Sequence, residues 1–133
     1  MTIPLPLSFS RTRIKICGLT REQDVDAAVA AGADAIGFVM YPPSPRHVTL
    51  ERAAELARRL PPFVTPVLLF VNASATEIIA ACARIPGAMV QFHGDESPQD
   101  CLRVGLPFLR AARIPLDDSP TPGAARFDLI KYA

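Results

Sequence analysis

Tryptophan is absent from the chain, and histidine and cysteine are scarce, with two and three residues among 133. The odd cysteine count argues against a secreted disulfide framework, and so do the first eleven residues, which lack a basic start ahead of an apolar stretch. His47 and His93 do not stand at metal-ligand spacing from any cysteine, which argues against a structural zinc site. We therefore expect a protein of the reducing cytoplasm with no metal.

An excess of charge and long apolar runs are also lacking. Fourteen lysines and arginines against thirteen acids give a net charge of +1, which gives no reason to expect nucleic acid or a membrane surface as a partner. No apolar run approaches the roughly 20 residues that span a bilayer. Half of the residues are hydrophobic and 20% are charged, a composition typical of a globular protein with a sizeable core.

What the chain does contain is a regular alternation of short apolar segments and helical patterns. Helix starts are indicated by capping-box patterns at residues 20–23 and 74–77, by Thr49, and by Ser97 with Pro98 after it. Gly32 and Gly105 are placed to end helices. The apolar segments between these signals predict strands at residues 13–18, 35–40, 67–71, 89–93 and 109–114.

The two ends of the chain differ from this pattern. Residues 1–12 contain two prolines and are expected to form a flexible leader. Residues 115–123 have the composition of a loop, and residues 128–132 resemble the first turn of one more helix. The sequence thus predicts a leader at residues 1–12, followed at residues 13–133 by the N-terminal part of a single domain.

Alternating strands and helices predict an α/β fold with a parallel sheet, which could be a doubly wound sheet or a (β/α)₈ barrel. Helices cover both faces of a doubly wound sheet, so its central strands are apolar throughout. Here the first and fourth expected strands carry polar side chains on one face, near their carboxyl ends: Lys15 and Cys17, then Gln91 and His93. This favours a barrel that stops after about five strand–helix units.

Cys17 is the sharpest chemical signal. It ends a barrel strand, the position where barrel enzymes keep catalytic groups, and Lys15 on the same face supplies positive potential that favours a thiolate. The alternative is a small buried side chain, which is what most free cysteines are. Cys82 and Cys101 fall on helical patterns and are expected to be packing residues.

Two further side chains fall at the same edge of the expected sheet. His93 could act as an acid, a base or an orienting donor, or it could simply be a hydrogen-bonded histidine at a strand end. Gln91 on the same face favours a polar pocket. Arg46 follows the second strand, where a guanidinium suits a carboxylate or a phosphate, although many loop arginines are only solvated.

Five motifs resemble one family in the same order and spacing. They are KICGLT at residues 15–20, GADAIGF at 32–38, YPPSPR at 41–46, FVN at 70–72 and QFHGDE at 91–96. Together they resemble phosphoribosylanthranilate isomerase from about residue 13 onward. Phe92 departs from the family, in which leucine is more usual at that position.

The resemblance implies an activity and roles for the residues. The family carries out the Amadori rearrangement of N-(5-phosphoribosyl)anthranilate to 1-(2-carboxyphenylamino)-1-deoxyribulose 5-phosphate, an isomerisation in L-tryptophan biosynthesis. By resemblance, Cys17 is the general base and Arg46 binds the anthranilate carboxylate. His93, Gln91 and Lys15 line the substrate pocket. The resemblance calls for a small-molecule substrate and for no cofactor or metal.

Parts of the family pattern have no counterpart in these residues. The family's general acid is an aspartate at the end of strand six, and its phosphate-binding loops follow strands seven and eight. Asp117 and Asp118 are no substitutes, since they fall in the expected loop at 115–123. We therefore expect the fragment alone to be inactive. Two alternatives stay open: another sugar-phosphate barrel isomerase or lyase, and a non-catalytic half-barrel that self-associates.

Overall fold

The computed structural model describes residues 11–114 as alternating strands and helices. The strands are β1 (Lys15–Cys17), β2 (Ala35–Val39), β3 (Thr65–Phe70), β4 (Met89–Phe92) and β5 (Phe108–Arg110). The helices are α1 (Glu22–Ala30), α2 (Leu50–Ala57), α3 (Ala75–Arg84) and α4 (Pro98–Arg103). Residues 1–10 of the leader expected at 1–12, Asp117, Asp118 and the expected helical turn at 128–132 lie outside the described residues. The boundaries of the expected domain stay a prediction.

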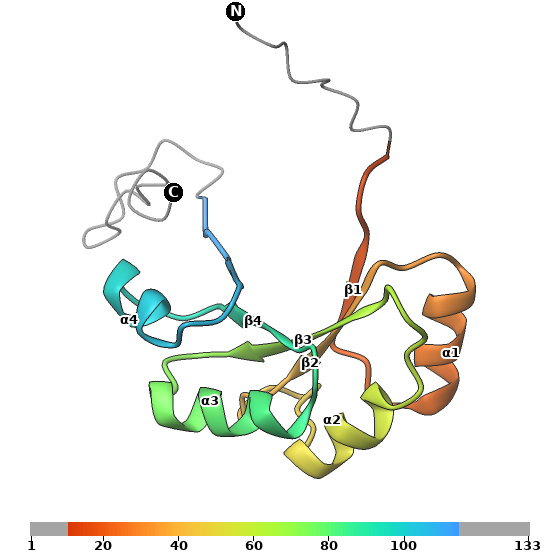
Figure 1. The fold of residues 1–133 in the computed structure, drawn as a ribbon, viewed down its shortest axis with the longest axis horizontal. Coiled ribbons are helices and arrows are strands. Elements are labelled where there is room, and N and C mark those ends of the chain that lie inside the picture. The colour runs from red at the N-terminus through yellow and green to blue at the C-terminus, as the bar shows by residue number, and fades with distance from the viewer. Residues whose placement is uncertain (1–10, 115–133) are drawn as a thin grey trace, which may run out of the picture.

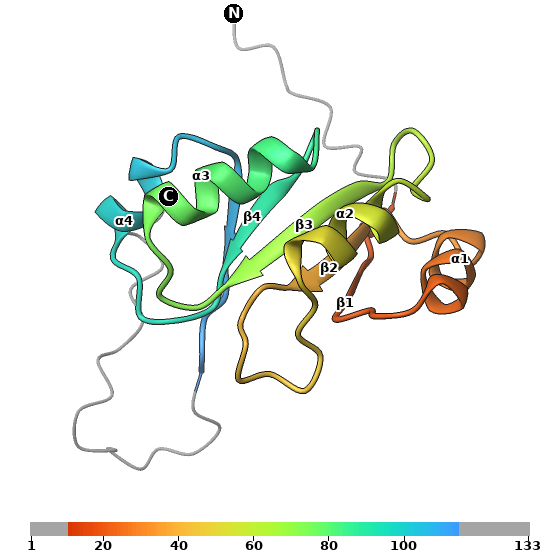
Figure 2. The same cartoon turned by 90° about the horizontal axis from the view of Figure 1, so that it is seen from below.

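The strands form one five-stranded sheet in the order β1-β2-β3-β4-β5, and every neighbouring pair is parallel. The helices lie on one side of the curved sheet. In Figure 1, α2 and α3 run below the strands and α1 lies to the right of them, and α2 and α3 lie in front of the strands when the molecule is seen from below in Figure 2. A doubly wound sheet would carry helices on both faces. The expected barrel architecture is confirmed, as a half-barrel.

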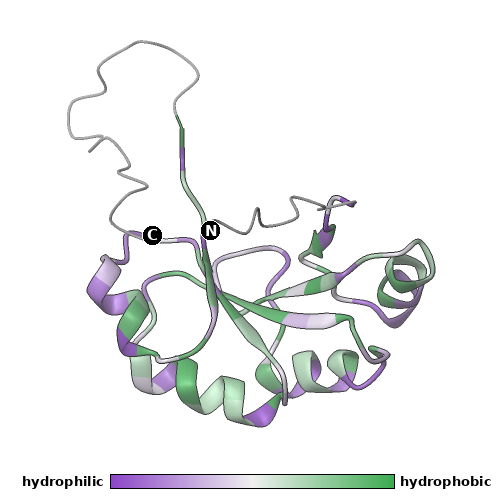
Figure 3. Cartoon of the chain, turned by 45° about the horizontal axis from the view of Figure 1, so that its top comes forward, coloured by the Kyte–Doolittle hydropathy of each residue, from purple (hydrophilic) through white to green (hydrophobic). Residues whose placement is uncertain are grey.

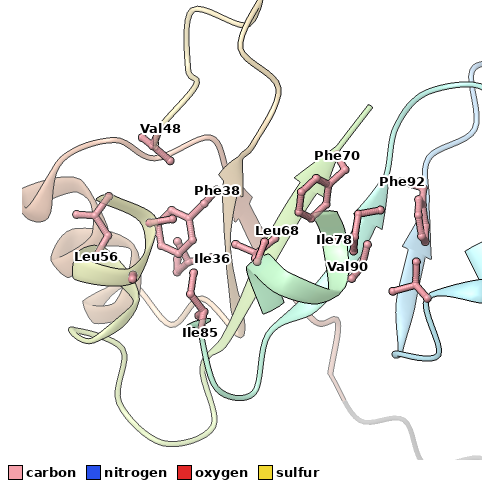
Figure 4. Close-up of a cluster of buried hydrophobic side chains, with 14 of the residues drawn as sticks. Ile36, Phe38, Val48, Leu56, Leu68, Phe70, Ile78, Ile85, Val90 and Phe92 are labelled. Atoms are coloured by element: carbon pink, nitrogen blue, oxygen red, sulfur yellow. The ribbon is translucent and has the colours of Figure 1, made fainter. Parts of the chain in front are cut away.

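The core lies between the sheet and these helices because every second residue of the central strands points toward them. The strands are coloured mainly as hydrophobic in Figure 3, and the helices carry both kinds of residue. Figure 4 shows the buried cluster, to which the strands contribute Ile36, Phe38, Leu68, Phe70, Val90 and Phe92 and the helices contribute Leu56 and Ile78. The opposite face of the sheet, which we call the inner face, is not covered by these helices.

The expected strand boundaries were wrong at the edges of the sheet. β5 was expected at residues 109–114, whereas it covers Phe108–Arg110, because its only strand partner among the described residues, β4, offers four residues. The last inter-strand bond of this pair runs from the Ala111 N–H to the Phe92 oxygen at 2.9 Å. β1 is likewise shorter than the expected 13–18, with strand pairing limited to Lys15–Cys17.

Three helix starts form as expected. The side chains of Thr49, Ser74 and Ser97 each accept a hydrogen bond from a backbone N–H in the first turn of α2, α3 and α4. At α4 the Asp100 side chain completes a capping box by accepting from the Ser97 N–H, with Pro98 in the first turn. Each of these caps ends a loop that runs from the carboxyl end of a strand to the next helix.

The capping box expected at residues 20–23 was wrong. The N-cap of α1 is Arg21, whose side chain makes no cap bond. Glu22 instead receives a two-pronged hydrogen bond from Arg52 of α2, at 2.5 and 2.8 Å. The guanidinium also donates to the Thr20 oxygen at 3.2 Å, so Arg52 links the start of α1 to α2.

Ion pairs at the surface give two carboxyl groups unusually low pKa values. The hydrogen bond from Arg52 lowers the pKa of Glu22 to about 2. Asp34, at the start of β2, accepts from the Arg11 guanidinium and from the Ile14 N–H. The guanidinium first and the N–H second lower the pKa of Asp34 to about 2. Glu22 thereby links α1 to α2, and Asp34 links the start of β2 to the segment that precedes β1.

Residues 11–114 contain neither a membrane-spanning helix nor a cluster of metal ligands. No helix among them is long and apolar enough to cross a membrane. No group of three or more histidine, cysteine or acidic side chains among them could hold a metal ion.

Candidate active site at the carboxyl ends of the strands

Because all the strands are parallel, their carboxyl ends meet at one edge of the sheet. Cys17 is the last residue of β1, and the segment from Met40 to Thr49 follows β2 at the same edge. His93 comes directly after β4. The folded chain thus brings segments that are far apart in sequence to a single rim, as the sequence predicted.

The Cys17 side chain lies on the face of the sheet opposite the helices. A Cβ atom added to Gly37, the residue paired with Cys17 on β2, would lie 2.7 Å from Cys17 Sγ. The neighbours of Gly37 on its strand, Ile36 and Phe38, point into the helix-side core, so Gly37 opens toward the inner face. The missing side chain of Gly37 makes room for the thiol, which is half-buried.

Arg46 reaches back from the loop after β2 to the end of β1. Its Nη1 donates to the Cys17 main-chain oxygen at 3.1 Å. The guanidinium lies over Gly18, where an added Cβ would meet Arg46 Nη1 at 2.5 Å and Cδ at 2.8 Å. Gly18 also has a φ of 84°, a left-handed conformation that glycine adopts without strain. Cys17 and Arg46 are therefore neighbours, as the barrel interpretation requires.

Gln91 and His93 share the inner face at the far side of the sheet from Cys17, with β2 and β3 between them. Gln91 Oε1 and His93 Nδ1 are buried and have no hydrogen-bond partner among the described residues. The backbone of His93 is anchored, since its N–H donates to the Phe70 oxygen at 3.0 Å. Buried polar atoms are nearly always hydrogen-bonded in folded proteins, so these two atoms are open to a partner from outside the described residues.

Lys15 lies two residues before Cys17 on the same face and is half-buried. Within residues 11–114 its ammonium group has no ion pair or hydrogen bond. Its charge is therefore not neutralised by a neighbouring acid in this part of the chain. Together with Arg46 it makes the rim near Cys17 positive.

The other two cysteines are packing residues, as expected. Cys101 is fully buried in the helix-side core and Cys82 packs against it. Burial is the main cause that raises the pKa of both thiols above the ordinary value. All three cysteines of the chain are free thiols.

Several contacts at the rim could not be predicted from the sequence. Arg113 donates to the His93 oxygen at 3.3 Å, and Glu96 and Arg110 form an ion pair of 3.4 Å beneath the loop that follows β4. The room that Gly37 leaves for Cys17 was also not predicted, although a glycine inside a strand often marks a close approach of another group. The partners of the charged residues could not be found from spacing along the chain.

A parallel sheet in sequential order, with helices on one face and polar side chains at the carboxyl rim, is half of a (β/α)₈ barrel of the enzymatic kind. The model of the family described as N-(5'phosphoribosyl)anthranilate (PRA) isomerase matches residues 14–129. The chain belongs to this family.

Individual relatives agree with this assignment. The N-(5'-phosphoribosyl)anthranilate isomerase of Methylibium petroleiphilum is 65% identical over 123 residues, which are 92% of this chain and 54% of the relative. The chain thus spans about half the length of the curated relatives it matches.

Solved structures show the same fold. A crystal structure of mutually generated monomers of the dimeric isomerase from Thermotoga maritima is similar with a TM-score of 0.70 and 33% identity, over 75% of this chain and 52% of that one. A phosphoribosylanthranilate isomerase in complex with reduced 1-(o-carboxyphenylamino)-1-deoxyribulose 5-phosphate gives a TM-score of 0.73 and 36% identity, over 75% and 53% of the two chains.

Proposed function

We propose that this chain provides the first half of an isomerase that converts N-(5-phosphoribosyl)anthranilate to 1-(2-carboxyphenylamino)-1-deoxyribulose 5-phosphate in L-tryptophan biosynthesis. The observation that carries the proposal is the meeting of Cys17 and Arg46 at the end of β1. Family membership supports it, and so does the ligand named for the relative that was solved as a complex.

Cys17 acts as the general base in this proposal. The furanose ring opens when an acid protonates the ring oxygen, which leaves a Schiff base between the sugar and the anthranilate nitrogen. The Cys17 thiolate then removes the proton from the adjacent sugar carbon, and the electron pair moves onto the nitrogen to give an enolamine. Tautomerisation of the enolamine gives the ketone product. By resemblance to the family, the acid is the aspartate at the end of strand six, which has no counterpart in this sequence.

Arg46 binds the anthranilate carboxylate. A guanidinium has five N–H groups, and among the described residues only one hydrogen bond of the Arg46 side chain is found, to the Cys17 oxygen. That bond fixes the plane of the guanidinium beside the reacting thiol, and its other N–H groups can bind a carboxylate in the two-pronged manner. The substrate is held within reach of the base in consequence.

Gln91, His93 and Lys15 complete the substrate pocket. The unpartnered Gln91 Oε1 can accept a hydrogen bond from a sugar hydroxyl, and His93 Nδ1 can donate or accept one. Lys15 adds positive charge on the face that carries Cys17, which attracts an anionic substrate. Side chains alone perform these steps, and no cofactor takes part in them.

The cellular setting forms part of the same proposal. Three free thiols fit a reducing compartment, so we place the protein in the cytoplasm. Its substrate is a small anionic molecule, with no nucleic acid or membrane as partner. Neither the compartment nor the class of partner follows from family membership alone.

A second candidate is a half-barrel that assembles with another copy of itself. Three apolar side chains on the edge strands, or next to them, support it: Ile14 is 48% exposed, Ile16 is 38% exposed and Leu109 is 40% exposed. An edge strand with exposed apolar side chains is a template for pairing with another chain. The dimeric Thermotoga maritima relative is a precedent for self-association in the family.

The test is a hybrid chain that joins this sequence to the part of the Methylibium petroleiphilum relative that the match does not cover. Expressed in a bacterium that lacks this isomerase, the hybrid should restore growth without tryptophan. The chain alone is the control and should not. If the purified hybrid folds but turns over only other sugar phosphates, the function lies elsewhere among barrel isomerases. A stable oligomer of the chain alone would favour the second candidate.

A further inference from the structure

A buried carboxylate lies beneath the rim, outside the site described above. Glu96 is 5% exposed and is the only buried charged residue in the described part of the chain. Its Oε1 accepts from the Asn72 N–H at 2.9 Å, and its Oε2 accepts from the Gly94 N–H at 2.9 Å. It therefore holds the backbone of two loops, the one after β3 and the one after β4.

The partner of Glu96 on the next strand holds the same loop from the other side. Arg110 of β5 forms a 3.4 Å ion pair with Glu96, and its own side chain is 10% exposed. Its Nη2 donates to the Gly94 oxygen at 2.8 Å, and its Nη1 donates to the Phe92 oxygen at 3.4 Å. The ion pair thus contacts the main chain on both sides of His93.

The backbone at this point has little freedom left. Asn72 has a φ of 53°, in the left-handed region, and its Oδ1 accepts from the Asp95 N–H at 2.8 Å. A Cβ added to Gly94 would meet Asn72 Oδ1 at 2.5 Å. Asparagine adopts the left-handed conformation more readily than most residues, and the contacts of its main chain and side chain tie the loop after β3 to the loop after β4.

These contacts lead to a role for Glu96. We infer that Glu96 is a positioning residue that, through Gly94 and Arg110, holds the backbone of His93 so that the imidazole keeps its place on the inner face. The inference rests on the proposed function, in which His93 lines the substrate pocket. Stability alone is a weaker explanation, because a buried ion pair often contributes no more than a well-packed apolar pair would.

The first test uses the chain itself and does not depend on catalysis. Amide hydrogen exchange followed by NMR should show Asn72 and Gly94 losing at least about tenfold in protection in Glu96→Gln, since each N–H loses a bond to a charged acceptor. The amides of Val25 and Ala53 should be unchanged. Asp95→Asn removes a charge from the exposed neighbour in the same loop and is the matched control. Unchanged exchange at Asn72 and Gly94 would overturn the inference.

A second variant covers the case in which Glu96→Gln does not fold. Arg110→Lys keeps the positive charge but cannot serve two carbonyl oxygens and a carboxylate together. It should loosen Gly94 and leave the amide of Val25 protected. If Gly94 keeps its protection in this variant, Arg110 has no part in holding the loop.

The third test uses the active hybrid chain and a double-mutant cycle between Glu96→Gln and His93→Ala. If Glu96 acts through His93, kcat/KM of the double variant should lie within about twofold of that of His93→Ala alone. Losses that multiply would show that Glu96 acts independently of His93 and would overturn the inference. An inactive unsubstituted hybrid would contradict the proposed function instead, and the exchange experiment would still decide whether Glu96 holds the loop.

Discussion

The Arg46 guanidinium donates a 3.1 Å hydrogen bond to the main-chain oxygen of Cys17, which joins two residues 29 positions apart. The bond passes over Gly18, whose lack of a side chain leaves room for the guanidinium. The proposed base and the proposed carboxylate-binding guanidinium are thus held in a fixed position relative to each other by the backbone at the end of β1.

Gly18→Ala should disturb this relation. The new methyl group would collide with Arg46, and the residue would be held at a φ of 84°. Gly32→Ala is the control, because Gly32 has a φ of 96° and no atom near its missing Cβ. We expect both variants to lose about 1 kcal/mol of unfolding free energy from backbone strain in urea unfolding, because the flexible Arg46 side chain can move away from the new methyl group. In the hybrid chain only Gly18→Ala should also lose affinity for a product analogue, and equal affinity in the two variants would contradict the collision.

Arg46→Lys should weaken binding of the anthranilate group. An ammonium cannot form two parallel hydrogen bonds to a carboxylate, so affinity of the hybrid chain for a product analogue should fall by roughly tenfold or more. Arg58→Lys, on an exposed arginine after α2, is the control. Calorimetric titration measures both affinities. Equal affinity in Arg46→Lys and the unsubstituted hybrid would make Arg46 only a surface residue.

The three thiols should differ in reactivity. Burial raises the pKa of Cys82 and Cys101, so both have less thiolate than an ordinary cysteine. Iodoacetamide at mildly alkaline pH should therefore modify Cys17 first and Cys101 last, as followed by peptide mass spectrometry. Modification of Cys101 at the same rate as Cys17 would contradict the packing described here.

Stability should fall in acid because Glu22 and Asp34 have pKa values near 2 in the folded chain. Their contribution is present above the ordinary carboxyl pKa and is lost as the pH falls toward about 2. Glu22→Gln should reduce the loss measured by urea unfolding between neutral pH and pH 3, whereas Glu51→Gln on an exposed position of α2 should not. An identical pH dependence in both variants would remove the pair with Arg52 as a cause.

The alternation of strands and helices could be predicted because its signals are local. Thr49, Ser74 and Ser97 cap helices where the sequence places them, and apolar residues at every second strand position predicted the helix-side core. The capping box at residues 20–23 failed because α1 begins at Glu22, with Arg21 and not Thr20 as its N-cap and with no side-chain cap bond. The pattern indicated a helix start correctly but placed the cap one residue too early.

The residues of the candidate site also divide into those that have a local signal in the sequence and those that do not. Cys17, Gln91 and His93 could be found from their places at strand ends, and Arg46 from a loop on the same side. Glu96 and Arg110 could not, because their roles depend on backbone atoms that only the fold brings near. Asn72 N, for example, lies 24 residues from the carboxylate that it contacts.

The most direct test of the central claim is turnover by the hybrid chain with and without the Cys17 thiol. Loss of phosphoribosylanthranilate fluorescence measures the reaction, and Cys82→Ala is the matched control. The account predicts that Cys17→Ala lowers kcat by a factor of roughly 10² to 10⁴, the usual contribution of a general base, while the affinity for a product analogue stays nearly unchanged. Near-normal turnover by the Cys17→Ala hybrid would contradict the assignment of Cys17 as the base.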